Sequence, residues 1–168
     1  MSPRVRPLLR EITAEDAGRI LDFTRQTGVF RDEELLIAEE VLLASAAELV
    51  GAVERPYYSL GAELEGRLVG WICWGATPCT VGTWDLYWLA VDPAAQGAGV
   101  GTALIEEMER RLAGRVRLIM IDTSGRPDYD PTRAFYEAKG YERAAVVRDF
   151  YAEGDDQVIY RKQFNRKG

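Results

Sequence analysis

The chain has 168 residues, of which 47% are hydrophobic and 29% are charged, and its formal net charge is -6. This length and composition are typical of one globular domain, so we expect a single domain over residues 1–168 rather than a disordered chain. The negative charge argues against nucleic acid as a partner, and the absence of histidine removes the commonest metal ligand and the commonest general base.

The lengths of the hydrophobic runs and the spacing of the cysteines indicate the cellular compartment of the protein. The longest apolar run, Leu68–Ala76, is far shorter than the roughly 20 residues that a membrane-spanning helix needs. The basic N-terminus is not followed by an apolar block of the signal-peptide type. Cys73 and Cys79 form no C-x-x-C pair and suggest no disulfide framework. We therefore expect a cytoplasmic protein with reduced cysteines and no membrane partner.

The first half of the chain predicts one strand, two helices and a β-hairpin. Thr13 is a suitable cap for a helix that begins at Ala14, and Gly28 ends that helix. The predicted elements are the strand Val5–Ile12, the helix from Ala14, a second helix at about Asp32–Leu49, and the hairpin strands Tyr57–Glu65 and Leu68–Ala76.

The second half alternates strands with helices. A helix between two strands is consistent with a parallel crossover. The helix that starts at Asp130-Pro131 has proline at its first position, where the missing N–H costs nothing. The predicted elements are the strand Thr83–Val91, the helix Gly99–Leu112, the strand Val116–Thr123, a loop Ser124–Asp130, the helix from Asp130 to Gly140, and the strands Tyr141–Tyr151 and Gln157–Phe164.

The segment Leu89–Thr102 carries the strongest functional signal, because an apolar strand runs into a glycine-rich turn that opens an amphipathic helix. At Gly97, Gly99 and Gly101 the main chain can take unusual dihedral angles and let a ligand approach closely. The first turn of the helix offers N–H groups without intrahelical partners and the positive end of the helix dipole. The layout predicts a phosphate-binding loop.

Three kinds of phosphate loop are compared by their spacing. A P-loop needs G-x-x-x-x-G-K-[ST], and no lysine lies near this turn. The dinucleotide pattern G-x-G-x-x-G fits Gly97 and Gly99, with Asp122 at about the right distance, but fails at Thr102, where the third glycine is required. The pattern Q-x-x-G-x-G is complete, as Gln96, Gly99 and Gly101.

This loop, after an L-A-V-D-P strand end, resembles the pyrophosphate loop of the GNAT family of N-acetyltransferases, and the order of the predicted elements resembles that family over nearly the whole chain. The resemblance implies an α/β (α+β) fold, a single GNAT-type domain whose mixed, mostly antiparallel sheet of about seven strands is flanked by about four helices. It also implies acetyl-CoA as cosubstrate and no metal. The residues that it assigns to the cofactor are Leu89, Ala90, Val91, Gln96, Gly97, Ala98, Gly99, Val100, Gly101 and Thr102.

A second motif, Thr132–Tyr141, resembles the GNAT segment A-x-x-Y-E-x-x-G-[FY], with Tyr136 four residues before Gly140. In that family the tyrosine lies near the coenzyme sulfur and often protonates the departing thiolate, which suits a phenol of pKa about 10. The alternatives are a packing residue and a purely binding residue. The family often has asparagine three residues before Ala134, and Pro131 stands there, so that coenzyme contact is lost.

The strand Thr83–Val91 supplies further candidates. By its period of two, Asp85 shares a face with Tyr87, Leu89 and Val91. In GNAT proteins the main-chain N–H groups near the end of this strand polarise the thioester carbonyl, which implies that role for Leu89–Val91. Asp85 matches the glutamate that deprotonates the amine in histone-acetylating relatives. The alternative is a structural pairing of Asp85 with arginine or main-chain N–H groups.

The acceptor site is expected near the junction of the first two helices, Gly28–Asp32, which usually forms part of it in this fold. Arg31 could pair with a substrate carboxylate and Phe30 could line a pocket, and Tyr87 is the third candidate substrate contact. The alternatives are a solvated loop arginine and a core phenylalanine.

The sequence thus predicts an acetyl-CoA-dependent N-acetyltransferase that acts on a primary amine of a small molecule or peptide. Direct attack of the amine needs neither a metal nor a covalent enzyme intermediate. The alternative is a coenzyme-binding sensor of the same fold without turnover, and a nucleotide-dependent oxidoreductase is weaker. We expect a monomer or homodimer.

Overall fold

The computed structural model describes residues 5–46 and 55–165. Its strands are β1 (Leu8–Glu11), β2 (Tyr58–Leu64), β3 (Arg67–Ala76), β4 (Thr83–Val91), β5 (Leu118–Ser124), β6 (Glu142–Ala152) and β7 (Asp155–Gln163). Its α-helices are α1 (Ala17–Gln26), α2 (Asp32–Ala46), α3 (Val100–Leu112) and α4 (Asp130–Ala138), and short 3-10 turns are η1 (Ala14–Asp16), η2 (Pro93–Ala95) and η3 (Pro127–Tyr129).

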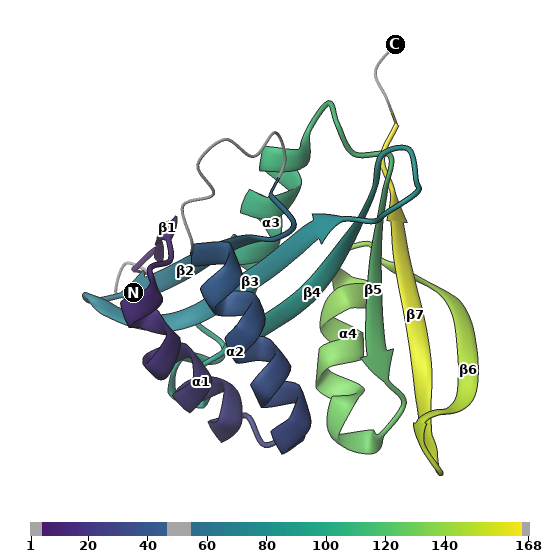
Figure 1. Cartoon of the computed structure of the whole chain (residues 1–168), viewed down its shortest axis with the longest axis horizontal. Helices are drawn as coiled ribbons and strands as arrows, with labels where there is room; N and C mark the ends of the chain where they lie inside the picture. The colour runs from purple at the N-terminus through teal and green to yellow at the C-terminus, as the bar shows by residue number, and fades with distance from the viewer. Residues whose placement is uncertain (1–4, 47–54, 166–168) are drawn as a thin grey trace. The chain divides into compact units, whose positions relative to one another are not determined.

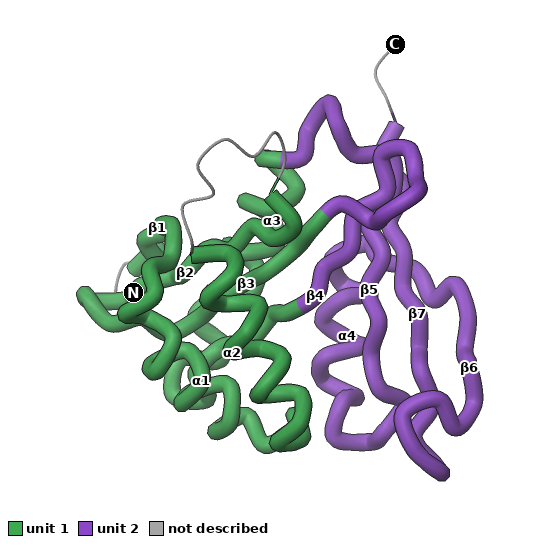
Figure 2. Tube along the Cα trace, viewed as in Figure 1, with its two compact units in different colours: residues 1–75, 88–111 green, residues 76–87, 112–168 purple. Residues whose placement is uncertain are grey.

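The strand order is β1-β2-β3-β4-β5-β7-β6, and the pairing of β4 with β5 is parallel whereas β1–β2, β2–β3, β5–β7 and β6–β7 are antiparallel. This mixed seven-stranded sheet with four α-helices confirms the predicted fold class. The chain divides into two compact units, with residues 1–75 and 88–111 in unit 1 and residues 76–87 and 112–168 in unit 2 (Figure 2). Strand β4 contributes to both units.

Unit 1 packs helices on both faces of its strands. Helices α1 and α2 lie over one face and α3 lies behind the other (Figure 1). The alternation of β3 explains this arrangement: the Trp71 indole N–H donates to the Thr24 hydroxyl of α1 at 3.1 Å, whereas the neighbouring Gly70 adjoins Val100 and Leu104 of α3. The core cluster comprises Ile12, Ile20, Phe23, Ala38, Val41, Leu42, Leu68, Trp71, Cys73 and Ala90.

In the described part of unit 2, the α-helix α4 packs against the strands. In the sheet register Leu86 pairs with Ile121 and Ile121 pairs with Tyr160, so these side chains share one face. The ring of Tyr160 lies 6.4 Å from the ring of Tyr136 on α4. Helix α4 therefore covers this face, and the residues that alternate with it, including Asp85, point to the opposite face.

Three strands begin later or earlier than the sequence predicts, each for a local reason. Strand β1 begins at Leu8 because Pro7 has no N–H to donate to a ladder. Strand β5 begins at Leu118 because the Val116 N–H bonds to the Leu112 carbonyl at 3.0 Å, in the turn after α3. Strand β7 begins at Asp155, which pairs with Ala152 across a two-residue turn. The predicted end of the second helix, at Leu49, lies outside the described residues.

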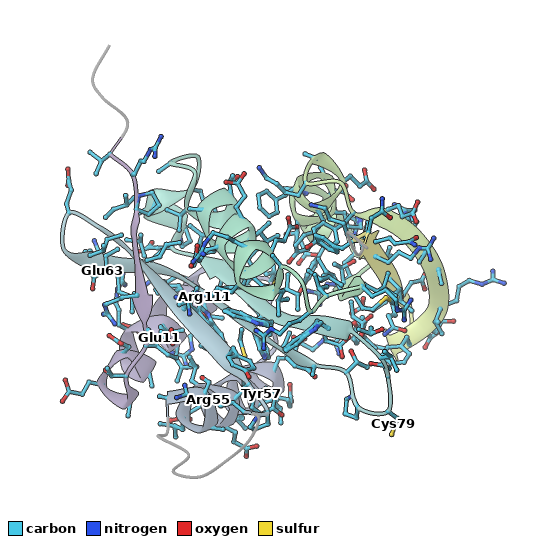
Figure 3. The ribbon with its side chains drawn as sticks, turned by 90° about the horizontal axis from the view of Figure 1, so that it is seen from above. Glu11, Arg55, Tyr57, Glu63, Cys79 and Arg111 are labelled. Carbon is cyan, nitrogen blue, oxygen red and sulfur yellow. The ribbon has the colours of Figure 1, made fainter. Side chains whose placement is uncertain are left out.

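An ion-pair cluster joins β1 to its neighbours in unit 1. Arg10 donates to Asp16 at 2.8 Å and to Glu63 at 2.7 Å, and Arg111 of α3 reaches Glu11 at 2.7 Å; Figure 3 labels Glu11, Glu63 and Arg111. The hydrogen bonds from the Arg10 guanidinium lower the pKa of Asp16 to about 2, against partial burial, which raises it. The cluster attaches the N-terminal strand to the sheet.

The two cysteines are free, as expected. Cys73 is buried in unit 1, and burial raises the pKa of its thiol to about 12. Cys79 is exposed on the segment between β3 and β4 (Figure 3). Within residues 5–46 and 55–165, no helix is both long and apolar enough to cross a membrane.

Candidate functional site

The glycine-rich loop starts at Asp92 and passes through η2 into α3. Gly97 and Gly99 have φ angles of 80° and 82°, in the left-handed region, and a Cβ atom at either position would meet nothing within 4 Å. Both glycines are therefore required by the main-chain conformation and not by crowding. Gly101 differs from the prediction of an unusual dihedral angle, because it already belongs to α3 and its φ is not positive.

The N-terminus of α3 presents its main chain to the loop. The Ala103 N–H donates to the Gly99 carbonyl at 3.0 Å, so the N–H groups of Val100, Gly101 and Thr102 precede the first hydrogen bond of the helix. Gln96, Gly97, Ala98 and Gly99 are all exposed. The arrangement supplies main-chain donors and the positive end of a helix dipole to an anion.

Asp92 is a buried carboxylate at the start of this loop. Its side chain accepts the Ala94 N–H at 2.9 Å and pairs with the guanidinium of Arg19 from α1, while Arg67 lies 3.6 Å away. Burial alone would raise the pKa of Asp92, but these hydrogen bonds and charges outweigh it and hold the pKa below its ordinary value. Asp92 is thus kept as an anion inside unit 1.

Asp85 lies on β4 in unit 2 and accepts a hydrogen bond of 2.6 Å from the Thr77 hydroxyl. It is opposite Met120 in the parallel ladder, so Asp122 is the next residue of β5 on the same face. Desolvation and the charge of Asp85 raise the pKa of Asp122, against a hydrogen bond from Gln157. The alternative predicted for Asp85 is a structural pairing with arginine or main-chain N–H groups. The structure pairs Asp85 with the hydroxyl of Thr77 instead.

Tyr136 lies on α4, and only 5% of its surface is exposed. Its ring contacts those of Phe135, Tyr141 and Tyr160, with centroids 5.6–6.4 Å apart. Burial raises the pKa of its hydroxyl, with a smaller effect from Tyr129, so the phenol stays protonated at neutral pH. These ring contacts agree with the alternative that Tyr136 is a packing residue. The protonated phenol also agrees with the role of general acid, which needs a proton to donate.

The predicted acceptor residues have structural surroundings of different kinds. The Phe30 ring lies 5.1 Å from the Trp88 ring and packs against the core of unit 1. Arg31 immediately precedes α2, where its N–H donates to Glu34 at 2.7 Å and its carbonyl accepts from Leu35. Tyr87 is 40% exposed on the face of Asp85.

The candidate residues fall into two groups. Unit 1 contains the cofactor candidates Leu89–Thr102, with Ala90 buried in the core, and also Phe30 and Arg31. Unit 2 contains Asp85, Tyr87 and Tyr136. Within unit 2, Asp85 and Tyr136 lie on opposite faces of the strands.

Two anchoring residues escaped the sequence analysis. One is Asp92, which the motif presents only as part of a strand end. The other is Arg133, 9% exposed, whose guanidinium bonds the carbonyls of Ser124 and Arg126 and pairs with Asp130. It thereby joins the end of β5 to the start of α4. The sequence signal that could have identified Arg133 is its position as a basic residue inside the predicted helix Asp130–Gly140.

The side chains of the described residues include no group of three His, Cys, Asp or Glu that could hold a metal ion. The chemistry that this part of the chain offers consists of main-chain donors, carboxylates and a buried phenol.

The sequence profile of the Acetyltransferase (GNAT) family matches residues 21–141, more than half of the chain. An uncharacterized N-acetyltransferase of Methanocaldococcus jannaschii is 30% identical over 112 residues, which are 64% of this chain and 67% of that protein. The N-alpha-acetyltransferase RimI of Mycobacterium tuberculosis is 31% identical over 107 residues, 61% of this chain and 64% of that protein. The chain thus spans about two thirds of the length of these two relatives.

Solved structures show the same fold. An acetyltransferase assigned to the GNAT family from Desulfovibrio desulfuricans has a TM-score of 0.83 and 36% identity, and the match covers 94% of this chain and 98% of that one. The PaiA N-acetyltransferase of Thermoplasma acidophilum, solved in complex with coenzyme A, has a TM-score of 0.71 and 18% identity over 94% of this chain and 99% of that one.

Proposed function

The chain belongs to the GNAT acetyltransferase family, a family of acyltransferases, and on this premise we propose that it transfers the acetyl group of acetyl-CoA to a primary amine. The observation that carries the proposal is the loop Gln96–Gly101, with Gly97 and Gly99 in the left-handed region and the open N-terminus of α3 behind them. Main-chain donors in this arrangement suit the pyrophosphate of coenzyme A. The PaiA N-acetyltransferase, which has this fold and was solved with coenzyme A bound, supports the same ligand.

The proposed reaction is a direct transfer. The neutral amine attacks the thioester carbon, so that a C–N bond forms and the C–S bond breaks. Main-chain N–H groups in Leu89–Val91 stabilise the oxyanion as it forms. The amine proton passes to Asp85, directly or through water, and Tyr136 donates its phenolic proton to the thiolate of coenzyme A.

The opposite orientations of Asp85 and Tyr136 support this division of roles. A base that receives the proton of the incoming nucleophile and an acid that protonates the leaving group serve opposite sides of the transferred carbonyl. The β4–β5 ladder pairs Thr83–Leu86 with Leu118–Ile121, so Asp85 lies one residue before its last pair. Tyr136 lies on α4, which covers the opposite face of these strands.

The second candidate function is a coenzyme-binding sensor of the same fold without turnover. The packing of Tyr136 against Phe135, Tyr141 and Tyr160 favours it, because a packed tyrosine needs no catalytic role.

Release of free coenzyme A thiol, measured with a panel of amines, tests the proposal. The panel covers amino acids, polyamines, aminoglycosides and peptide N-termini, and binding of acetyl-CoA is measured in parallel by calorimetry. We expect binding together with amine-dependent thiol release. Tight binding with no release for any amine would favour the sensor. Binding of NAD(P) in place of acetyl-CoA would favour an oxidoreductase.

A further inference from the structure

We propose that Arg19 of α1 is a positioning residue for the coenzyme loop, which it holds in its binding conformation through Asp92. The inference rests on the proposed binding of acetyl-CoA to this loop. The Arg19 side chain bonds Leu68 and Asp92, which are neither proposed pyrophosphate donors nor reacting groups, and no part of the Q-x-x-G-x-G pattern includes Arg19.

The loop is exposed in its middle and buried at its two ends. Gln96–Gly99 are exposed, whereas Asp92 is 2% exposed and Val100 is 1% exposed. Two glycines with positive φ give this stretch little conformational preference of its own. The contacts of Asp92 and Val100 must therefore fix the direction in which its N–H groups point.

Arg19 fixes the first end by two contacts. Its Nε donates to the Leu68 carbonyl of β3 at 3.0 Å, and its Nη2 forms the ion pair with the Asp92 carboxylate. The same carboxylate accepts the N–H of Ala94, the second residue of η2. A guanidinium suits this bridge because its planar fork carries donors in fixed directions. Arg19 thereby connects α1, β3 and the first turn of the loop.

Strand β3 holds the loop from both ends with three consecutive residues. Leu68 accepts from Arg19, and the Val69 carbonyl accepts the Asp92 N–H at 2.7 Å. Gly70 lies against Val100: a Cβ atom on it would come within 2.6 Å of Val100 Cγ1. The apolar end of the loop is thus fixed by close packing, and the polar end depends on Arg19 and Asp92.

This arrangement predicts that loss of the Arg19 side chain weakens coenzyme binding and leaves the rate of acetyl transfer unchanged. A loop held in its bound conformation avoids an ordering cost when ligand binds, and removal of the restraint restores that cost. The proposed acid and base lie in unit 2, whereas Arg19 lies in unit 1.

The test compares Arg19→Met with Arg19→Lys and with the matched control Arg25→Met. Arg25 lies on the same helix, with a side chain 62% exposed and a 3.9 Å contact to Asp22. For Arg19→Met we expect the Kd of acetyl-CoA and its KM to rise about 10-fold with kcat within about twofold of wild type. Arg19→Lys should recover part of the affinity, since lysine keeps the charge but not the fork, and Arg25→Met should match wild type.

Arg19→Met leaves the Asp92 charge buried without its main partner and could lower folding stability, so the double variant Arg19→Met/Asp92→Asn is measured as well. We expect it to fold and to keep the raised Kd. Equal Kd values for Arg19→Met, Arg25→Met and wild type would overturn the inference, as would a fall in kcat with KM unchanged. A wild-type protein that binds no acetyl-CoA would instead refute the proposed function, and this inference with it.

Discussion

In unit 1 the buried carboxylate of Asp92 is paired with Arg19 and accepts a main-chain N–H, whereas in unit 2 the carboxylate of Asp122 shares a sheet face with Asp85 and bonds to the neutral side chain of Gln157. The pKa of the first is lowered and that of the second is raised. Pairing with arginine favours the ionised form of a carboxyl group, while burial beside another carboxylate favours the protonated form. We propose that unit 1 positions the ligand and that unit 2, which contains Asp85 and Tyr136, carries the proton transfer.

The largest expected effect is on the chemistry assigned to unit 2. Tyr136→Phe removes the proposed proton donor and keeps the packed ring, so we expect kcat to fall about 100-fold with the Kd of acetyl-CoA unchanged. Tyr141→Phe is the matched control, since Tyr141 is 2% exposed and lies 6.1 Å from the Tyr136 ring, and it should keep kcat within about twofold. Equal kcat values for the two variants would reduce Tyr136 to a packing residue.

A smaller effect is expected from crowding the scaffold of unit 1. Gly70→Ala forces its Cβ against Val100 and Leu104, so we expect a loss of about 1–3 kcal/mol in the free energy of unfolding, together with weaker binding of acetyl-CoA. Gly18→Ala is the control, because Gly18 lies in α1 and a Cβ atom there would meet nothing within 4 Å, and it should stabilise by about 0.5–1 kcal/mol. Denaturant unfolding measures both. A stable Gly70→Ala variant with normal affinity would break the link between β3 and the loop.

The acids of unit 1 should stabilise the fold at neutral pH. The folded-state pKa of Asp16, about 2, lies below its ordinary value, so its stabilisation is present above about pH 4 and is lost as the pH falls through about 2. We expect Asp16→Asn to cost about 1 kcal/mol at pH 7, after allowance for solvent screening, and progressively less as the pH falls through about 2. Urea unfolding across this range checks it, and a cost that does not depend on pH would contradict the ion-pair explanation.

The smallest expected effect is that of Asp122→Asn in unit 2, which should raise the free energy of unfolding, whereas Asp16→Asn in unit 1 should lower it. The folded-state pKa of Asp122 is raised, so ionisation of Asp122 lowers the stability of the folded state as the pH rises through that value. Relative to wild type, Asp122→Asn should therefore gain a few tenths of a kcal/mol, about the size of a screened surface interaction, between about pH 4 and pH 7. A variant that loses stability relative to wild type over the same range would show that Asp122 is paired and not opposed.

The sequence predicts the conformation of the glycine-rich turn better than the surroundings of Asp85 and Tyr136. The requirement for positive φ at Gly97 and Gly99 is local, so their spacing between a strand and a helix is enough to identify the turn. The alternation of β4 likewise gives the shared face of Asp85 and Tyr87.

Contacts between distant segments account for what the sequence does not predict. Arg19 and Asp92 are 73 residues apart, and no local pattern connects them. The neighbour of Asp85 across the sheet depends on the parallel register with β5, which periodicity does not determine. The packing of Tyr136 depends in the same way on Tyr160 of β7.

The most direct test of this division between binding and chemistry is the double variant Gly99→Ala/Tyr136→Phe, with the Kd of acetyl-CoA and kcat measured beside both single variants. Gly99→Ala places a Cβ on a residue with φ of 82°, at a cost of about 1–2 kcal/mol, and should weaken binding alone. We predict that the double variant has the Kd of Gly99→Ala and the kcat of Tyr136→Phe. A Tyr136→Phe substitution that weakens acetyl-CoA binding as much as Gly99→Ala does would contradict the account.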